Sequence, residues 1–177
     1  MSTAVSTALS RFERREYKYV IDSGAYDALT AIFKTHLEPD AHSAGDGSYS
    51  ILSVYYDTRD YRLIAQSMAG TGYKAKLRLR AYGPFSAKAL VFLELKVKYD
   101  GISYKRRLSL SYKEAQGLVN KGQLPLTLQD NQRQVAMEIV AFCRRYPLAR
   151  TTAISYRRQA WVSPAVTAEG LRITVDS

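Results

Sequence analysis

Basic and small apolar residues alternate strictly along residues 74–82, and this segment suggests chemistry more directly than any other. Its bases are Lys74, Lys76, Arg78 and Arg80, with alanine or leucine between them. A period of two is the period of a β-strand, so one face of the strand would be apolar and the other would carry like charges about 6.6 Å apart. Such a row repels itself, and a polyanion is the natural ligand to relieve the repulsion.

The same alternation recurs in four other segments of the chain. In each of them the charged residues fall mainly on one parity, and leucine, isoleucine, valine or tyrosine occupies the other. The charged members are Arg14, Glu16, Lys18, Glu94, Lys96, Lys98, Lys105, Arg107, Arg172 and Asp176. A sheet built from these strands would have one face lined with lysine and arginine.

Length and composition suit one basic domain. The chain has 177 residues and a formal net charge of +10, which favours an acidic partner: nucleic acid, an anionic membrane or a phosphate-rich small molecule. The single cysteine, Cys143, allows no intrachain disulfide and fits a reducing compartment. No apolar run approaches the roughly 18 residues of a transmembrane helix. We therefore expect a cytoplasmic protein without a transmembrane segment.

Strands and helices must position these charges, and local signals indicate where they begin and end. We expect residues 1–10 to be a flexible tail and residues 11–177 to be a single domain. Asp22 or Ser23 caps a first helix, and Thr58 a short second one. Ser111 and Glu114 have capping-box spacing. The predicted strands are 12–21, 49–57, 74–82, 89–99, 102–110, 151–162 and 171–176, and the predicted helices are 24–36, 58–68, 111–122 and 130–146.

These elements predict an α+β fold, in which an antiparallel sheet curls and helices lie outside it. The apolar strand faces would pack against the helices, so the basic faces would point inward. Unpaired charges are too costly to bury in a dry core. The basic lining therefore predicts a water-filled tunnel or groove that holds anions.

Seven segments in order resemble one family, the catalytic domain of the vacuolar transporter chaperone (VTC) polyphosphate polymerases. This family lies within the triphosphate tunnel metalloenzyme superfamily, which also includes CYTH-like proteins. The segments are 14–19, 53–58, 76–83, 92–96, 103–107, 156–161 and 171–176, and from the first to the last they span nearly all of the chain. CYTH members open with Glu-x-Glu-x-Lys, whereas this chain has Arg14, Glu16 and Lys18. The base in the first place resembles the VTC branch.

The resemblance implies a reaction and a set of residues for it. The reaction would transfer the γ-phosphoryl group of ATP to a polyphosphate chain inside the tunnel, with a divalent metal, manganese or magnesium. The side chains implied to grip the phosphates, and so to be catalytic, are Lys18, Arg78, Arg80, Lys96, Lys105, Arg158 and Arg172. Strand parity and the basic row add Arg14, Lys76 and Arg107 as phosphate-binding residues. Such chemistry needs positioning and charge stabilisation more than covalent help.

Metal binding is the weaker part of this expectation. Glu16 and Glu94 are the carboxylates on the tunnel-facing parity of the strong motifs, and they could hold the metal. The alternative, which we favour, is that they balance neighbouring lysine and arginine charges. The family's later strands, with a glutamate for the metal and a late lysine, have no counterpart here. We therefore expect an incomplete tunnel barrel and an exposed sheet edge, which predicts association with another chain, such as a homodimer, or poor stability.

Three other functions stay open at this point. A non-catalytic module that binds polyphosphate or inositol pyrophosphates would need the same cationic lining without a metal. A triphosphatase would need more carboxylates in the tunnel. Nucleic-acid binding is suggested by charge alone, and we do not expect it, because it would want the bases on an exposed face beside aromatic platforms.

Overall fold

The structure is a computed structural model that describes residues 16–41, 43, 47–70, 72–86, 89–126, 128–164 and 170–177. The chain forms two compact units, Met1–Leu37 and Glu38–Ser177. Its elements are α1 (Ser23–His36), β1 (Glu38–Pro39), β2 (Ser48–Asp57), α2 (Arg62–Met68), β3 (Tyr73–Tyr82), β4 (Leu90–Tyr99), β5 (Ile102–Ser111), α3 (Tyr112–Lys121), α4 (Asp130–Arg145), β6 (Ala149–Val162) and β7 (Arg172–Asp176).

The first unit contains α1, which begins where the sequence predicts. The Oδ1 atom of Asp22 accepts a hydrogen bond from the Ala25 backbone N–H at 2.8 Å, and this satisfies a donor that the first turn would otherwise leave unpaired. Phe33 is the buried residue of its apolar stripe, whereas Ile32 is half exposed. The cap and the helix are both confirmed.

The strand predicted at residues 12–21 is wrong in its described part. Residues 16–21 form no strand, and Tyr17 and Tyr19 are 71% and 81% exposed. Alternation alone does not make a strand, because each strand needs a neighbour for its backbone hydrogen bonds. Residues 12–15, and with them Arg14, lie outside the described residues.

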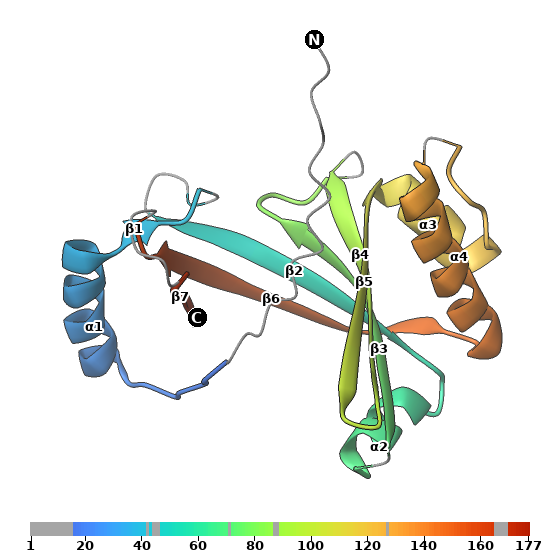
Figure 1. Cartoon of the computed structure of the whole chain (residues 1–177), viewed down its shortest axis with the longest axis horizontal. Helices are drawn as coiled ribbons and strands as arrows, with labels where there is room; N and C mark the ends of the chain where they lie inside the picture. The colour runs from blue at the N-terminus through green and yellow to red at the C-terminus, as the bar shows by residue number, and fades with distance from the viewer. Residues whose placement is uncertain are drawn as a thin grey trace. The chain divides into compact units, whose positions relative to one another are not determined.

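The second unit is built on one antiparallel sheet in the order β1-β6-β2-β3-β4-β5, with β7 on β6 (Figure 1). The long strands β2 and β6 run at a steep angle to β3, β4 and β5 (Figure 1), so the sheet is strongly twisted and curls into a half-barrel. A register shift between Tyr55 and Tyr56 interrupts the β2–β6 ladder, and such bulges increase local twist. The expected α+β fold with a curled antiparallel sheet is confirmed.

One face of β3, β4 and β5 is apolar and forms the core of the second unit. Helices α3 and α4 pack on it, and α2 packs on β3 and β2 (Figure 1). Alternate residues of each strand meet there, at 5% exposure or less. These residues, which we call the apolar face, are Ala75, Leu77, Leu79, Ala81, Val91, Leu93, Leu95, Leu108 and Leu110.

The helices that cover the apolar face are fixed by their ends. Ser111 and Glu114 form the expected capping box at the start of α3, with the Glu114 carboxylate accepting from the Ser111 backbone N–H at 2.9 Å. Gly122 ends the helix at a positive φ of 65°, which a glycine adopts without strain. Within α4, burial raises the pKa of the Cys143 thiol to about 11. This suits a packed, unreactive cysteine.

Asp57 explains how β2 leads into α2. Its buried carboxylate accepts hydrogen bonds from the backbone N–H groups of Thr58, Leu63 and Ile64 at 2.7–3.0 Å. The Thr58 hydroxyl oxygen accepts from the Arg62 N–H at 2.9 Å. The predicted Thr58 cap therefore exists, but Asp57 does the larger part of the capping. The carboxylate is needed because the residue just before the helix, Tyr61, provides no side-chain cap.

Candidate anion-binding face

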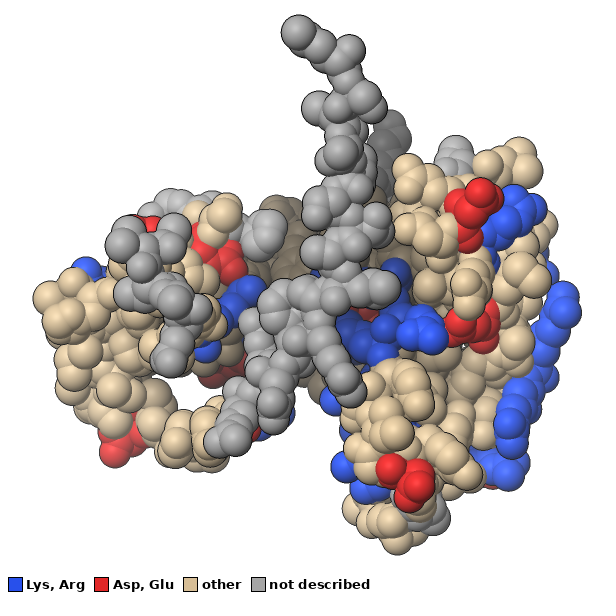
Figure 2. Space-filling view, viewed as in Figure 1, with Lys and Arg blue, Asp and Glu red and all other residues tan. Residues whose placement is uncertain are grey.

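The face of β3, β4 and β5 opposite the apolar face is rich in cations, which lie among a few aromatic and hydroxyl side chains. Register places these side chains in rows across the three strands, with neighbouring strands about 4.8 Å apart. We call this the cationic face; it consists of Lys74, Lys76, Arg78, Arg80, Lys96, Lys98, Lys105 and Arg107, with Glu94 as its one carboxylate. Figure 2 shows lysine and arginine side chains gathered over β4 and β5.

Lysines make up the rows nearest the β4–β5 turn. Lys76, Lys96 and Lys105 lie abreast, and Lys74 is directly opposite Lys98 in the next row. Like charges directly across a sheet destabilise it. Among the described residues, neither Lys76 nor Lys96 has an ion-pair partner. These ammonium groups are therefore available to a bound anion.

Glu94 lies at the centre of the next row and is 3% exposed. Its Oε2 accepts a hydrogen bond from Arg78 Nε at 2.7 Å, and its Oε1 lies 3.2 Å from Lys105 Nζ and 3.3 Å from Arg107 Nε. Burial alone would raise the pKa of this carboxyl, but attraction to Arg78 and Lys105 outweighs burial and lowers it. Glu94 therefore stays ionised as the shared counter-ion of three bases.

Aromatic and hydroxyl side chains fix the arginines of the same rows. Arg78 donates to the Tyr55 hydroxyl at 3.3 Å, and Arg80 donates to the buried Ser53 hydroxyl at 3.2 Å. Arg107 donates to the Tyr82 hydroxyl at 3.4 Å. The Arg107 guanidinium carbon also lies 3.8 Å from the centre of the Phe92 ring. The guanidinium groups are held in place before any ligand arrives.

A second group of arginines lies on β6 and β7. Arg158 forms a two-pronged pair with Asp176 at 2.6 and 2.7 Å, and hydrogen bonding to that carboxylate raises the pKa of Arg158. Arg172 donates to the buried Asp40 carboxylate and, at 3.4 Å, to the Tyr49 hydroxyl.

Tyr49 connects the two groups across the sheet. Its ring centre is 6.0 Å from that of Tyr82, whose hydroxyl accepts from Arg107. Tyr49 lies opposite Arg158 in the register of β2 and β6. Arg158 therefore faces the same side of the sheet as Arg78 and Arg80.

Most of the predicted site residues thus share one side of one sheet. Arg78, Arg80, Lys96, Lys105, Lys76, Arg107 and Glu94 lie on β3–β5, and Arg158 and Arg172 on β6 and β7. Lys18 and Glu16 belong to the first unit, where they are exposed and their side chains approach to 3.9 Å. Arg14 lies outside the described residues.

Sequence reasoning missed the residues that hold these bases. Tyr55, Ser53, Phe92, Asp40 and Asp176 were given no role, although each contacts an arginine of the site. Their partners lie 15–132 residues away along the chain. Cross-strand register brings them together, and the single sequence carries no signal for it beyond parity.

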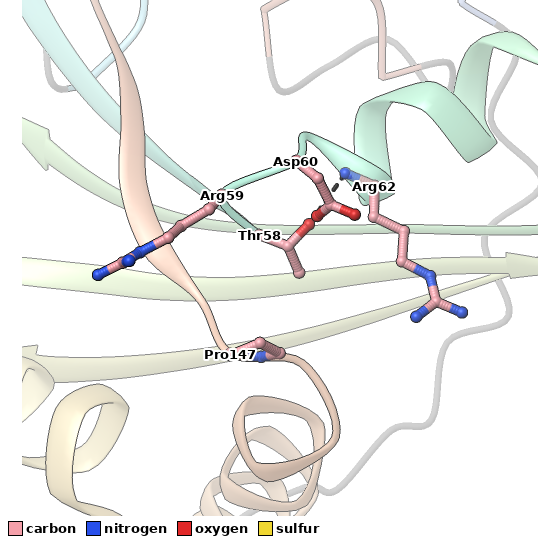
Figure 3. Close-up of a pocket in the computed structure, with 5 residues that line it drawn as sticks. All are labelled: Thr58, Arg59, Asp60, Arg62 and Pro147. Atoms are coloured by element: carbon pink, nitrogen blue, oxygen red, sulfur yellow. Dashed lines mark hydrogen bonds between the residues drawn. The ribbon is translucent and has the colours of Figure 1, made fainter.

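A pocket of about 290 Å³ lies elsewhere, between the β2–α2 loop and the turn before β6. Figure 3 shows Arg59 and Arg62 extending in different directions from it, and the Arg62 backbone N–H bonded to Thr58. Its two arginines do not converge on a common point. The pocket is therefore a poorer anion site than the cationic face.

Two further features bear on cofactors and membranes. In the described part of the chain, no three histidine, cysteine, aspartate or glutamate side chains gather as a metal site. No helix among the described residues is long and apolar enough to span a bilayer.

The fold and the cationic face together define an α+β domain whose curled antiparallel sheet carries a strongly basic face. The chain matches the family model of the VTC domain over residues 13–177, so it belongs to the VTC domain family. This membership supports a function related to polyphosphate or triphosphate. A search of curated proteins finds no match. Among solved structures, the chain is similar to a proposed adenylate cyclase from Bacillus halodurans, with 17% identity over 89% of this chain and 76% of that one and a TM-score of 0.47.

Proposed function

We propose that the chain is a polyphosphate polymerase domain, which transfers the γ-phosphoryl group of ATP to a polyphosphate chain held on the cationic face. The observation that carries the proposal is the set of eight basic side chains around one carboxylate on the cationic face, opposite the apolar face on which α3 and α4 pack. Such a surface binds an extended chain of phosphates better than a compact ligand, because charge is spread over three strands.

The residue types suit phosphoryl transfer. Pre-positioned arginines present paired N–H donors to phosphate oxygens, and lysines supply movable point charges. The reaction needs in-line placement of the attacking oxygen and stabilisation of charge on the equatorial oxygens. In this proposal Arg78, Arg80 and Arg107 hold the reacting phosphates, and Lys76 and Lys96 hold the neighbouring chain. The roles of Lys18, Arg158 and Arg172 remain predictions.

Glu94 does not fit the divalent metal that the family implies. Each of its oxygens lies within 3.3 Å of a basic nitrogen, so a metal cation bound here would be repelled by three neighbouring positive charges. Glu16, in the first unit, remains an untested candidate. Manganese or magnesium stays in the proposal as a requirement of the reaction, without an assigned ligand.

The same observation favours a second candidate function, a module that binds polyphosphate or inositol pyrophosphates without catalysis. Glu94 lies beside three bases and can orient them for an anion, and this role does not require a metal. The two candidates differ in whether ATP is consumed. A cytoplasmic location is a prediction under either.

A homodimer through the edge of β5 also remains a prediction. Among the described strands, β5 pairs only with β4, so its outer edge is available. Lys105, Arg106 and Arg107 occupy the middle of that edge. Symmetric pairing of two β5 strands would bring these bases close to their copies, so charge disfavours it.

The experiment is to incubate the purified chain with ATP and Mn²⁺, and to follow polyphosphate and ADP by ³¹P NMR. The polymerase proposal expects polyphosphate formation, with loss of product in Arg78→Gln and retention in Arg133→Gln, an exposed α4 residue on the other side of the sheet. Tight polyphosphate binding without product would favour the binding module. Failure to bind polyphosphate at all would refute both.

A further inference from the structure

A buried carboxylate at the centre of a cationic face is unexpected on electrostatic grounds. Glu94 cancels one of the charges that would attract a polyanion, and its burial costs solvation free energy. The neighbouring rows contain no other acid: Lys76, Lys96 and Lys105 lie on one side of it, and Arg80, Phe92 and Ser109 on the other. A surface that needed only positive charge would have a neutral residue here.

The contacts of Glu94 suggest what its negative charge does. Arg78, Lys105 and Arg107 come from strands on both sides of β4, and all three nitrogens lie 2.7–3.3 Å from its oxygens. These bases are partly exposed, with side-chain exposures of 26%, 56% and 40%. The carboxylate therefore contacts these three bases on their buried side, while part of each basic side chain remains exposed to a ligand.

The guanidinium groups have second contacts that complete their placement. Arg78 reaches Tyr55, and Arg107 is bonded to Tyr82 and stacked on Phe92. Each arginine is thus held from two directions, and Glu94 is the one group common to both. Holding a flexible base in advance reduces the conformational entropy that binding would otherwise lose.

We propose that Glu94 is a positioning residue, which aligns Arg78, Lys105 and Arg107 for the oxygens of a bound phosphate chain and acts without a metal. The inference rests on the proposed function, since it needs this face to bind phosphates. It assigns Glu94 a role through other residues rather than direct contact with the ligand, which its negative charge would repel.

The substitution Glu94→Gln separates positioning from charge, because the two effects have opposite signs. The variant gains one unit of positive charge, so charge alone predicts tighter binding of inorganic tripolyphosphate. Loss of positioning predicts weaker binding, by about tenfold, which corresponds to about 1.4 kcal/mol. Binding is measured by isothermal titration calorimetry on the full chain, with EDTA present, so that a role as a metal ligand cannot cause the difference.

Glu138→Gln is the matched control. Glu138 pairs with Arg106 at 2.6 Å on the helix side of the sheet, so the control breaks a similar pair and adds the same charge. We expect the affinity of this variant for tripolyphosphate to stay within about twofold of the wild type, because salt screens a charge that lies about a Debye length from the ligand.

A double-mutant cycle tests whether Glu94 acts through Arg107. If it does, Glu94→Gln should weaken binding much less in an Arg107→Gln background than alone, because coupled residues are not additive. If Glu94→Gln fails to fold, as judged by circular dichroism, the binding of Glu94→Asp distinguishes positioning from charge. That variant keeps the charge and shortens the reach, so positioning predicts weaker binding and charge alone predicts no change.

The outcomes separate this inference from the proposed function. The inference is supported if Glu94→Gln or Glu94→Asp binds tripolyphosphate more weakly than the wild type and Glu138→Gln binds it equally well. If the wild type binds tripolyphosphate and the Glu94 variants bind it equally well or more tightly, the inference is overturned and the proposed function stands. A wild-type chain that does not bind tripolyphosphate overturns both.

Discussion

Replacing two lysines in the rows of the cationic face nearest the β4–β5 turn should make the protein more stable and its binding of phosphate weaker. Lys76 and Lys96 are direct cross-strand partners on β3 and β4, and neither has an ion-pair partner among the described residues. In the unliganded protein they repel each other. In the proposed complex both would face the bound phosphate chain. The double substitution Lys76→Gln/Lys96→Gln therefore changes the two quantities in opposite directions.

Both magnitudes follow from the spacing. Like charges directly opposite on a sheet cost about 0.2–1 kcal/mol, so relief of this pair should raise the free energy of unfolding by up to about 1 kcal/mol. A lysine at about 4 Å from a phosphate charge contributes about 1 kcal/mol in water-like surroundings. Two such lysines should therefore be worth about 2 kcal/mol, or about thirtyfold in the Kd for tripolyphosphate.

Urea denaturation measures the first quantity and calorimetric titration the second, both at low ionic strength, where screening is weakest. The control is Lys113→Gln/Arg133→Gln, which removes the same charge from exposed positions of α3 and α4. Its Kd should stay within about threefold of the wild type, since distant charges are screened. Equal losses of affinity in the two double variants would show that net charge, rather than this face, attracts the ligand, and the reasoning would be refuted.

Two other predictions concern stability. Asp57→Ala should lower the free energy of unfolding by about 2–3 kcal/mol, because three backbone N–H groups lose their acceptor. Asp57→Asn retains one of the two oxygens and should cost about half as much. Urea denaturation measures both, and equal midpoints for the two variants would contradict this prediction. The second follows from the pKa of Glu94, which lies below its ordinary value of 4.5. Its contribution to stability is present above that value and is lost as the pH falls through the lower, folded-state pKa. The wild type should therefore lose more stability than Glu94→Gln between about pH 6 and about pH 3, and parallel curves would refute the assignment.

The faces of the sheet could be predicted from the sequence because they depend only on parity. Strict alternation in residues 74–82 places Lys76 and Arg78 on one side and Leu77 and Leu79 on the other, whatever the strand pairs with. The helix ends were predictable for a similar reason. Asp22 and the Ser111–Glu114 box act over three residues, so local sequence determines them.

The organisation of the bases could not be predicted, because it depends on pairing between distant strands. Arg78 meets Glu94 across a hairpin, but Arg172 meets Asp40 over 132 residues. The same limit explains the error at residues 16–21, where alternation suggested a strand. A strand needs a partner as well as a pattern.

Burial on the apolar face offsets the charge repulsion on the cationic face of the same sheet. A sheet with eight bases on one side would be destabilised by their repulsion unless something offsets it. Burial of the leucines of the apolar face beneath α3 and α4 supplies that stabilisation, since each fully buried leucine is worth about 2 kcal/mol. Glu94 relieves the repulsion further where three of the bases converge. The remaining repulsion, concentrated at the lysine rows, is what a phosphate chain would neutralise, so binding should stabilise the fold in proportion to the logarithm of the ligand concentration once that concentration exceeds the Kd.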